Sequence, residues 1–68
     1  MTLEVGTQVR TLVELRADSG AFIEEGSRAM VLGYQGAKLL ISDQDGETAV
    51  CEVWEVLRVK PQVIGRGT

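Results

Sequence analysis

The sequence predicts one small all-β domain built from about five short antiparallel strands. Its 68 residues suffice for a single domain, close to the lower size limit at which a hydrophobic core keeps a domain folded without a metal or disulfides. Hydrophobic residues make up 44% of the chain and the net charge is only -3, a composition typical of folded proteins. Glycines divide the chain into strand-sized segments. We expect the domain to cover residues 1–61, with a flexible C-terminal tail over residues 62–68.

The first strand is predicted over Val9–Arg16. One face of this strand carries the apolar residues Val9, Val13 and Leu15. Charged side chains alternate with them, which is the pattern of a half-buried strand. A short helix over residues 7–17 is the alternative, because Leu12 would continue an apolar helical stripe.

A long loop is predicted after this strand, over residues 18–26. It combines turn-forming residues with the apolar pair Phe22 and Ile23, and we expect one of these two side chains to anchor the loop to the core. The loop is acidic, with carboxylates at Asp18, Glu24 and Glu25.

Two hairpins are predicted next. Residues 28–34 and 38–42 form an apolar strand pair around a tight turn at Gln35-Gly36. Asp45-Gly46 is a dipeptide that tolerates the positive φ angles of hairpin turns, so residues 47–53 are expected to return as a fourth strand.

The ordered region is predicted to end with a single helical turn near Trp54 and a short last strand. Lys60-Pro61 is expected to stop that strand, because proline cannot continue a sheet ladder. Trp54 either caps the core or stands exposed as an interface anchor, and its flanking residues Val53 and Val56 favour the core.

The arrangement resembles the SH3-like small β-barrel group. The resemblance rests on Gly6-Thr7-Gln8-Val9-Arg10, the glycine-led strand over Gly26–Tyr34 and the final Glu55-Val56-Leu57-Arg58-Val59 segment, and it covers residues 4–60. Similar barrels include KOW-type modules of the transcription and translation machinery, small accessory subunits of photosynthetic and redox complexes, and type II dihydrofolate reductases. The resemblance implies an SH3-like barrel more firmly than any one activity, since such folds host unrelated functions.

The residue types present disfavour an enzyme. The chain has no histidine, so the usual proton shuttle is missing and a nucleophilic Cys51 would have no imidazole to activate it. We therefore expect Cys51 to be a small apolar core residue, and with a single cysteine no internal disulfide can form. The run Asp43-x-Asp45-Gly46-Glu47 lacks the remaining ligands of a calcium loop and is read as a hairpin turn. No catalytic, cofactor-binding or metal-binding residues are predicted.

Nucleic-acid binding, the activity that a KOW-type resemblance implies, is disfavoured by charge. The chain has ten acidic residues and only seven basic ones, so its net negative charge repels phosphates. A local basic stripe is the alternative, with a base stacked on Tyr34 or Trp54. Its members would be Arg10, Arg28, Arg58, Lys60 and Arg66.

A pore enzyme of the type II dihydrofolate reductase kind is a second alternative. That family carries Val-Gln-Ile-Tyr on its fourth strand, whereas the nearest positions here read Ala49-Val50-Cys51-Glu52-Val53. Because the motif is missing, no site residue of that family transfers to this chain.

The sequence is therefore interpreted as a non-catalytic protein-interaction or assembly module. Its partner-binding candidates are Asp18, Glu24, Glu25, Tyr34 and Trp54. Acidic side chains steer a basic partner, and open strand edges allow strand pairing with a partner or with a second copy of the chain. We expect no nucleic acid and no membrane as partners, and a reducing, cytoplasmic location, because there is one unpaired cysteine and no signal-peptide pattern.

Overall fold

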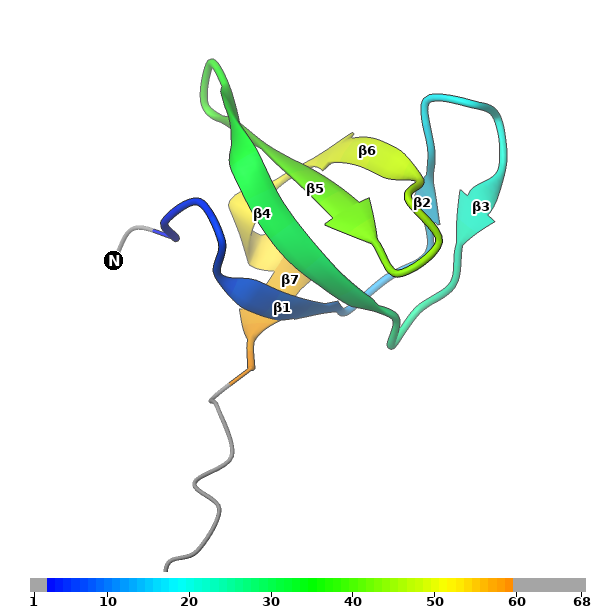
Figure 1. The fold of residues 1–68 in the computed structure, drawn as a ribbon, viewed down its shortest axis with the longest axis horizontal. Helices are drawn as coiled ribbons and strands as arrows, with labels where there is room; N and C mark the ends of the chain where they lie inside the picture. Colours follow the sequence, from blue (N-terminus) through cyan, green and yellow to red (C-terminus); the bar gives the residue numbers. More distant parts are fainter. Residues whose placement is uncertain (1–2, 60–68) are drawn as a thin grey trace, which may run out of the picture.

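The computed structural model describes residues 3–59, and these form an all-β domain (Figure 1). The strands are β1 (Gln8–Thr11), β2 (Leu15–Arg16), β3 (Phe22–Ile23), β4 (Arg28–Gln35), β5 (Lys38–Asp43), β6 (Thr48–Cys51) and β7 (Val56–Arg58). One 3-10 helical turn, η1 (Val53–Glu55), precedes β7. The predicted all-β, antiparallel fold class is confirmed, including the helical turn at Trp54, but the chain forms seven short strands where about five were predicted, because the first predicted strand is interrupted and the predicted loop contains β3. The predicted stop at Lys60-Pro61 and the tail over residues 62–68 lie outside the described residues.

The strands form two antiparallel sheets. The larger sheet has five strands in the order β6-β5-β4-β1-β7, and the smaller sheet pairs β2 with β3. The amide N–H of Asp18, in the turn after β2, donates to the carbonyl of Thr48 in β6 at 2.8 Å, which joins the small sheet to one edge of the large one. This arrangement is compatible with a small β-barrel-like fold.

A single core lies on the inner faces of these sheets. Its members are Val9, Leu15, Ala17, Ile23, Ala29, Val31, Leu39, Ile41, Ala49, Cys51 and Val56. They come from all seven strands and the turn after β2, so every strand contributes to the same apolar cluster. Aliphatic side chains dominate this core, which leaves all three aromatic residues exposed.

Both predicted hairpins are present. Gly46 has a φ of 86°, as the Asp45-Gly46 turn requires, and the Asp43 carboxylate accepts hydrogen bonds from the amides of Asp45 and Glu47 at 2.9 and 2.8 Å. The first hairpin turns one residue later than predicted, because Gln35 still pairs with Lys38.

The predicted continuous strand over residues 9–16 is wrong, and so is the helical alternative. The chain leaves the large sheet after Thr11 and rejoins a sheet only at Leu15. Val13, expected in the core, is 38% exposed. The break follows from the hydrogen bonds of Thr11. Its backbone bonds to the backbone of Gly26 and Ser27, and its hydroxyl donates to the carbonyl of Glu24. These bonds tie Thr11 to residues 24–27, and the residues after Thr11 leave the large sheet.

The predicted loop over residues 18–26 is partly a hairpin. Its second half contains β3, which pairs with β2 through Leu15 opposite Ile23 and Arg16 opposite Phe22. Ile23 is the anchor that the sequence predicted, since it is buried in the core. Phe22 stays outside, and the Arg16 guanidinium lies 5.3 Å from the centre of its ring.

Candidate interaction surfaces

Trp54 is held away from the core by the geometry of η1. The amide of Glu55 donates to the carbonyl of Glu52 at 2.9 Å, and the Glu55 carboxylate accepts from the amide of Glu52 at 2.8 Å. These two reciprocal bonds close the turn and leave none of its three residues buried. Trp54 is 71% exposed, so the expectation that it packs into the core is wrong.

Further exposed apolar residues lie in this turn and in the segments that adjoin it, and we call them together the Trp54 patch. Its members are Leu12, Val13, Val53, Trp54 and Leu57, all of them exposed. The amide of Leu12 donates to the carbonyl of Glu55 at 2.8 Å, which sets the break after β1 directly beside η1. Leu57 follows on β7, where it pairs with Arg10. The patch therefore joins segments that are about 40 residues apart in the sequence.

The patch borders an open strand edge. Among the described residues β7 has one neighbouring strand, β1. The amide of Leu12 donates to the carbonyl of Glu55, and the amide of Val59 donates to the carbonyl of Gln8. The backbone N–H and C=O groups of the odd-numbered residues from 55 to 59 therefore point toward β1. Because hydrogen-bonding direction alternates along a strand, the backbone groups of Val56 and Arg58 point away from β1.

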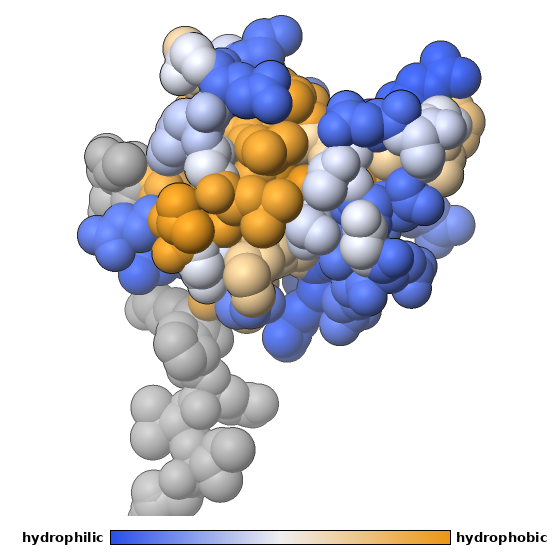
Figure 2. Space-filling model, turned by 45° about the horizontal axis from the view of Figure 1, so that its top comes forward, coloured by the Kyte–Doolittle hydropathy of each residue, from blue (hydrophilic) through white to orange (hydrophobic). Residues whose placement is uncertain are grey.

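A second apolar area covers the outward side of the large sheet, which we call the outer sheet face. A row of cross-strand neighbours on β4, β5 and β6 carries Leu32, Leu40 and Val50, and Met30 lies in the next row. Figure 2 shows apolar side chains gathered over β4 and β5 on this side, bordered by polar ones. A β-bulge between Val31 and Gly33 sets two residues of β4 opposite Leu40, which keeps Leu32 on the outside and turns Tyr34 toward the inner side.

Cations border this apolar row. Arg10 and Arg28 sit directly opposite each other on β1 and β4, and both are exposed. At the other end of the face, Lys38 forms an ion pair with Glu52 at 3.5 Å. The remaining neighbours in the second row are the neutral residues Gln8, Ser42 and Thr48. The outer sheet face thus carries three cations and the carboxylate of Glu52, and Asp43 lies at its border.

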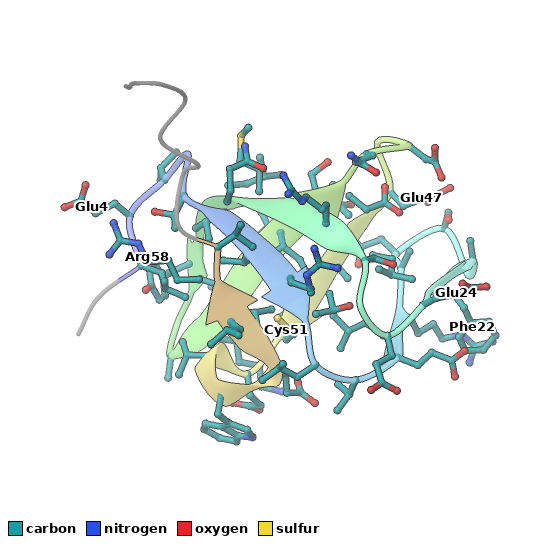
Figure 3. All side chains as sticks on the ribbon, turned by 90° about the horizontal axis from the view of Figure 1, so that it is seen from below. Glu4, Phe22, Glu24, Glu47, Cys51 and Arg58 are labelled. Carbon is teal, nitrogen blue, oxygen red and sulfur yellow. The ribbon has the colours of Figure 1, made fainter. Side chains whose placement is uncertain are left out.

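The acidic candidates lie elsewhere. Figure 3 shows Glu24 and Phe22 at one end of the molecule with Glu47 on the same side, and Glu4 and Arg58 at the opposite end. The Asp18 carboxylate accepts from the Thr48 hydroxyl at 2.9 Å, so Asp18 is tied to β6. Glu25 is exposed just after β3.

The five predicted site residues do not form one surface. Tyr34 pairs with Leu39, near the start of β5, and its hydroxyl accepts from the amide of Leu3 at 3.1 Å. The amide of Asp18 instead donates to the carbonyl of Thr48. The cross-strand partner of Thr48 is Ser42, which lies near the other end of β5. Asp18 and Tyr34 therefore lie near different ends of the sheet. The sequence reasoning also missed Leu12 and Leu57, which alternation alone cannot distinguish from core residues.

Cys51 lies in the core and has the properties of a packing residue. Burial raises the pKa of its thiol from 9.0 to about 11, with smaller contributions from the charges of Glu55 and Glu52. A thiol with this pKa is protonated at neutral pH, and the protonated form is a poor nucleophile. Among residues 3–59, no group of three metal-ligating side chains lies close enough to hold an ion.

A shallow groove lies along the border of the outer sheet face, beside Arg28. It is lined by Gln8, Arg28, Ala29, Met30, Ser42, Asp43 and Gln44. Its volume is about 190 Å³. Small-molecule sites typically measure roughly 300–1,000 Å³, so this groove fits a single side chain better than a cofactor.

Comparison of the chain with protein-family models, curated proteins and solved structures gave no match. Between residues 3 and 59 there is also no helix with the length and apolar character needed to cross a membrane.

Proposed function

We propose that this chain is a non-catalytic protein-interaction module of the SH3-like small-barrel group, and that it binds a partner protein through the Trp54 patch. The observation that carries the proposal is the 71% exposure of Trp54 on a turn closed by two reciprocal hydrogen bonds. Tryptophan is enriched among the residues that dominate binding energy at interfaces. A rigid turn adds to this effect, because little conformational entropy is lost when the ring is buried.

The exposed area of Trp54 is large enough to matter energetically. A large aromatic side chain buries roughly 150–250 Å². With 71% of its surface exposed, Trp54 has about 100–180 Å² left to bury against a partner. At about 25 cal/mol per Å², complete burial contributes about 3–4 kcal/mol before the costs of association. That is the size expected of a dominant interface residue.

The open edge of β7 supplies a second mode of contact. A partner strand that pairs with the outward backbone groups of Val56 and Arg58 would extend the sheet beyond β7. The side chain of Leu57 and the ring of Trp54 lie at that edge and would select the partner's apolar residues. Backbone pairing would contribute affinity, and the Trp54 patch would contribute specificity.

The SH3-like assignment is part of the proposal. It is supported by the strand order β6-β5-β4-β1-β7, the long connection between β1 and β4, and the single helical turn before the last strand. We further propose that the module works in the cytoplasm, where a buried, unpaired Cys51 stays reduced.

Charge favours a protein over a nucleic acid as the partner. Residues 3–59 contain ten carboxylates but only five basic side chains, a net charge of -5. A surface with this balance repels a phosphate backbone. A basic partner protein, in contrast, would be steered toward the acidic end that carries Glu24, Glu25 and Glu47.

The test is a quantitative affinity purification from the source cells with three tagged baits. The baits are the wild-type chain, Trp54→Ala and the matched control Phe22→Ala. Phe22 is an exposed aromatic residue on β3, outside the Trp54 patch. We expect one or more proteins to be retained by the wild type and by Phe22→Ala, and to be depleted at least tenfold with Trp54→Ala, because about 1.4 kcal/mol corresponds to a factor of ten.

Retention of the same proteins by Trp54→Ala would refute the Trp54 patch as the binding surface. Equal loss with both variants would also refute it, because the two substitutions share only the removal of an exposed aromatic ring. Circular dichroism spectra and melting curves of all three baits establish that each one is folded.

A further inference from the structure

The outer sheet face has a charge opposite to that of the rest of the domain. Residues 3–59 carry a net charge of -5, yet this face holds Arg10, Arg28 and Lys38 against two carboxylates, Glu52 and, in the groove beside Arg28, Asp43. Glu52 is already paired with Lys38, and the Asp43 carboxylate accepts hydrogen bonds from the amides of Asp45 and Glu47. The unpaired positive charge is therefore concentrated at the two arginines.

The pairing of Arg10 with Arg28 is unfavourable for the isolated domain. They are direct cross-strand partners, and like charges in this position repel each other. Arg10 donates one hydrogen bond to the carbonyl of Gly26 at 3.0 Å, which fixes its guanidinium but leaves further N–H groups to donate. In the described part of the chain, the Arg28 side chain forms no ion pair. An anion placed between the two guanidinium groups would remove the repulsion and accept charge-assisted hydrogen bonds from both.

Apolar side chains lie directly beside this cationic pair. Met30 is the next outward residue after Arg28 on β4, and the row of Leu32, Leu40 and Val50 follows. Met30 and Leu32 are each about 40% exposed. The groove of about 190 Å³ beside Arg28 can receive one side chain. The face thus offers an apolar strip (Figure 2) with the arginine pair at one end.

We propose that the outer sheet face is a second docking surface, and that its occupant is an acidic amphipathic segment of a partner protein. The apolar side chains of that segment lie on Leu32, Leu40 and Val50, and its carboxylates lie at Arg10 and Arg28. This goes beyond binding at the Trp54 patch, because it gives the domain two surfaces of different chemistry. A domain with two such surfaces can bring two proteins together.

Two other occupants fit the face less well. A single-stranded nucleic acid binds through aromatic rings on which its bases stack, and no aromatic side chain of residues 3–59 lies on this face. A second copy of the chain, placed face to face, would oppose its own arginine pair to an equally positive surface. An acidic amphipathic protein segment matches both features of the face, because its carboxylates pair with the arginines and its apolar side chains cover the aliphatic strip.

The test uses a phage-displayed library of random dodecapeptides, selected on the wild-type chain after removal of clones that bind the Arg10→Gln/Arg28→Gln double variant. The enriched peptide is synthesised, titrated calorimetrically, and mapped by amide chemical shifts. We expect a peptide that combines carboxylates with aliphatic residues and perturbs the amides of β4, β5 and β6. Each single arginine substitution should weaken its binding about tenfold, the effect of losing roughly one charge-assisted hydrogen bond.

Two variants serve as controls. Arg16→Gln removes a cation that lies over the Phe22 ring, outside the outer sheet face, and should leave peptide affinity within twofold. Trp54→Ala should also leave it unchanged, which separates this proposal from the one on the Trp54 patch. The double arginine variant should melt at or above the wild-type temperature, because it loses a like-charge pair.

Three results would overturn the proposal. The first is an enriched peptide without carboxylates, or one whose shifts map to η1 and leave β4, β5 and β6 unchanged; shifts that extend to β7 do not count against the proposal, because Leu57 is the cross-strand neighbour of Arg10. The second is that a twelve-nucleotide oligouridylate binds with the same arginine dependence while no peptide is enriched. The third is a concentration-dependent dimer in sedimentation that Leu40→Asp dissociates, because a second copy would then cover the face.

Discussion

Thr11 is the residue on which the long connection between β1 and β4 depends. It is 1% exposed and is the one buried polar residue between residues 3 and 59. Its hydroxyl donates to the carbonyl of Glu24 at 2.9 Å and accepts from the amide of Ser27 at 3.0 Å. Replacement by valine keeps the shape of the side chain and removes both bonds. We expect Thr11→Val to lower the free energy of unfolding.

The size of the loss in unfolding free energy depends on which hydrogen bonds the Ser27 amide and the Glu24 carbonyl keep after the substitution. The Ser27 amide keeps a longer bond of 3.2 Å to the Glu24 carbonyl, and that carbonyl still accepts from the Ser27 hydroxyl at 2.6 Å. Neither group is left without a partner, so the loss should be near the value of one to two ordinary hydrogen bonds, about 1–2 kcal/mol. In a domain of this size, about 1 kcal/mol shifts the melting temperature by roughly 4–8 °C.

Urea denaturation and thermal melting of Thr11→Val measure the effect. Thr48→Val is the matched control, because the Thr48 hydroxyl bonds the exposed carboxylate of Asp18 and should contribute less than about 0.5 kcal/mol. Hydrogen exchange at the Ser27 amide should also accelerate in Thr11→Val. Equal stability of Thr11→Val and wild type would refute the reasoning, and so would a larger loss in the control.

Two further predictions concern the second hairpin and the core. Gly46→Val should cost about 1–2 kcal/mol, because Gly46 has a φ of 86° that a β-branched residue tolerates poorly. Gly33→Ala, at a glycine with ordinary φ and open space around its Cβ, should leave the melting temperature unchanged or raise it. For Cys51 the folded-state pKa is about 11 against 9.0 for the free thiol, so its stabilising effect is complete below about pH 9 and is lost as the pH rises through 11. Unfolding free energies measured across this range should fall by about 2 kcal/mol more for wild type than for Cys51→Ala, and parallel curves would contradict the burial of the thiol.

The hairpins could be predicted from sequence because their signals are local. Asp45-Gly46 needs only its own backbone angles and the side chain of Asp43, and all three residues lie within four consecutive positions of the chain. The strands on either side alternate between inward and outward residues, as β5 and β6 do. The antiparallel pairing of β4, β5 and β6 follows from such signals, whereas the short strand β3, within residues predicted as a loop, does not.

The first strand could not be delimited in this way. The apolar alternation of residues 9–16 continues through Val13, but the chain leaves the sheet after Thr11. The cause is the set of hydrogen bonds from Thr11 to the loop over residues 24–27, which are distant in the sequence. A tertiary contact therefore overrides the local pattern.

The sequence left open whether Trp54 is buried or exposed and favoured burial, for a related reason. Its apolar neighbour Val53 favours burial, but the reciprocal bonds between Glu52 and Glu55 close a turn that points both side chains outward. The outer sheet face was also missed, since its four apolar members are spread over β4, β5 and β6 and meet only through cross-strand pairing.

Trp54 is the only tryptophan in the chain, so its fluorescence tests the central claim most directly. We predict that the native protein emits at nearly the same wavelength as the unfolded protein, and that a partner retained in the affinity purification shifts this emission to the blue while protecting it from acrylamide quenching. Native emission that is already blue-shifted in the absence of a partner would contradict the account, because Trp54 would then be buried within the chain or its oligomer.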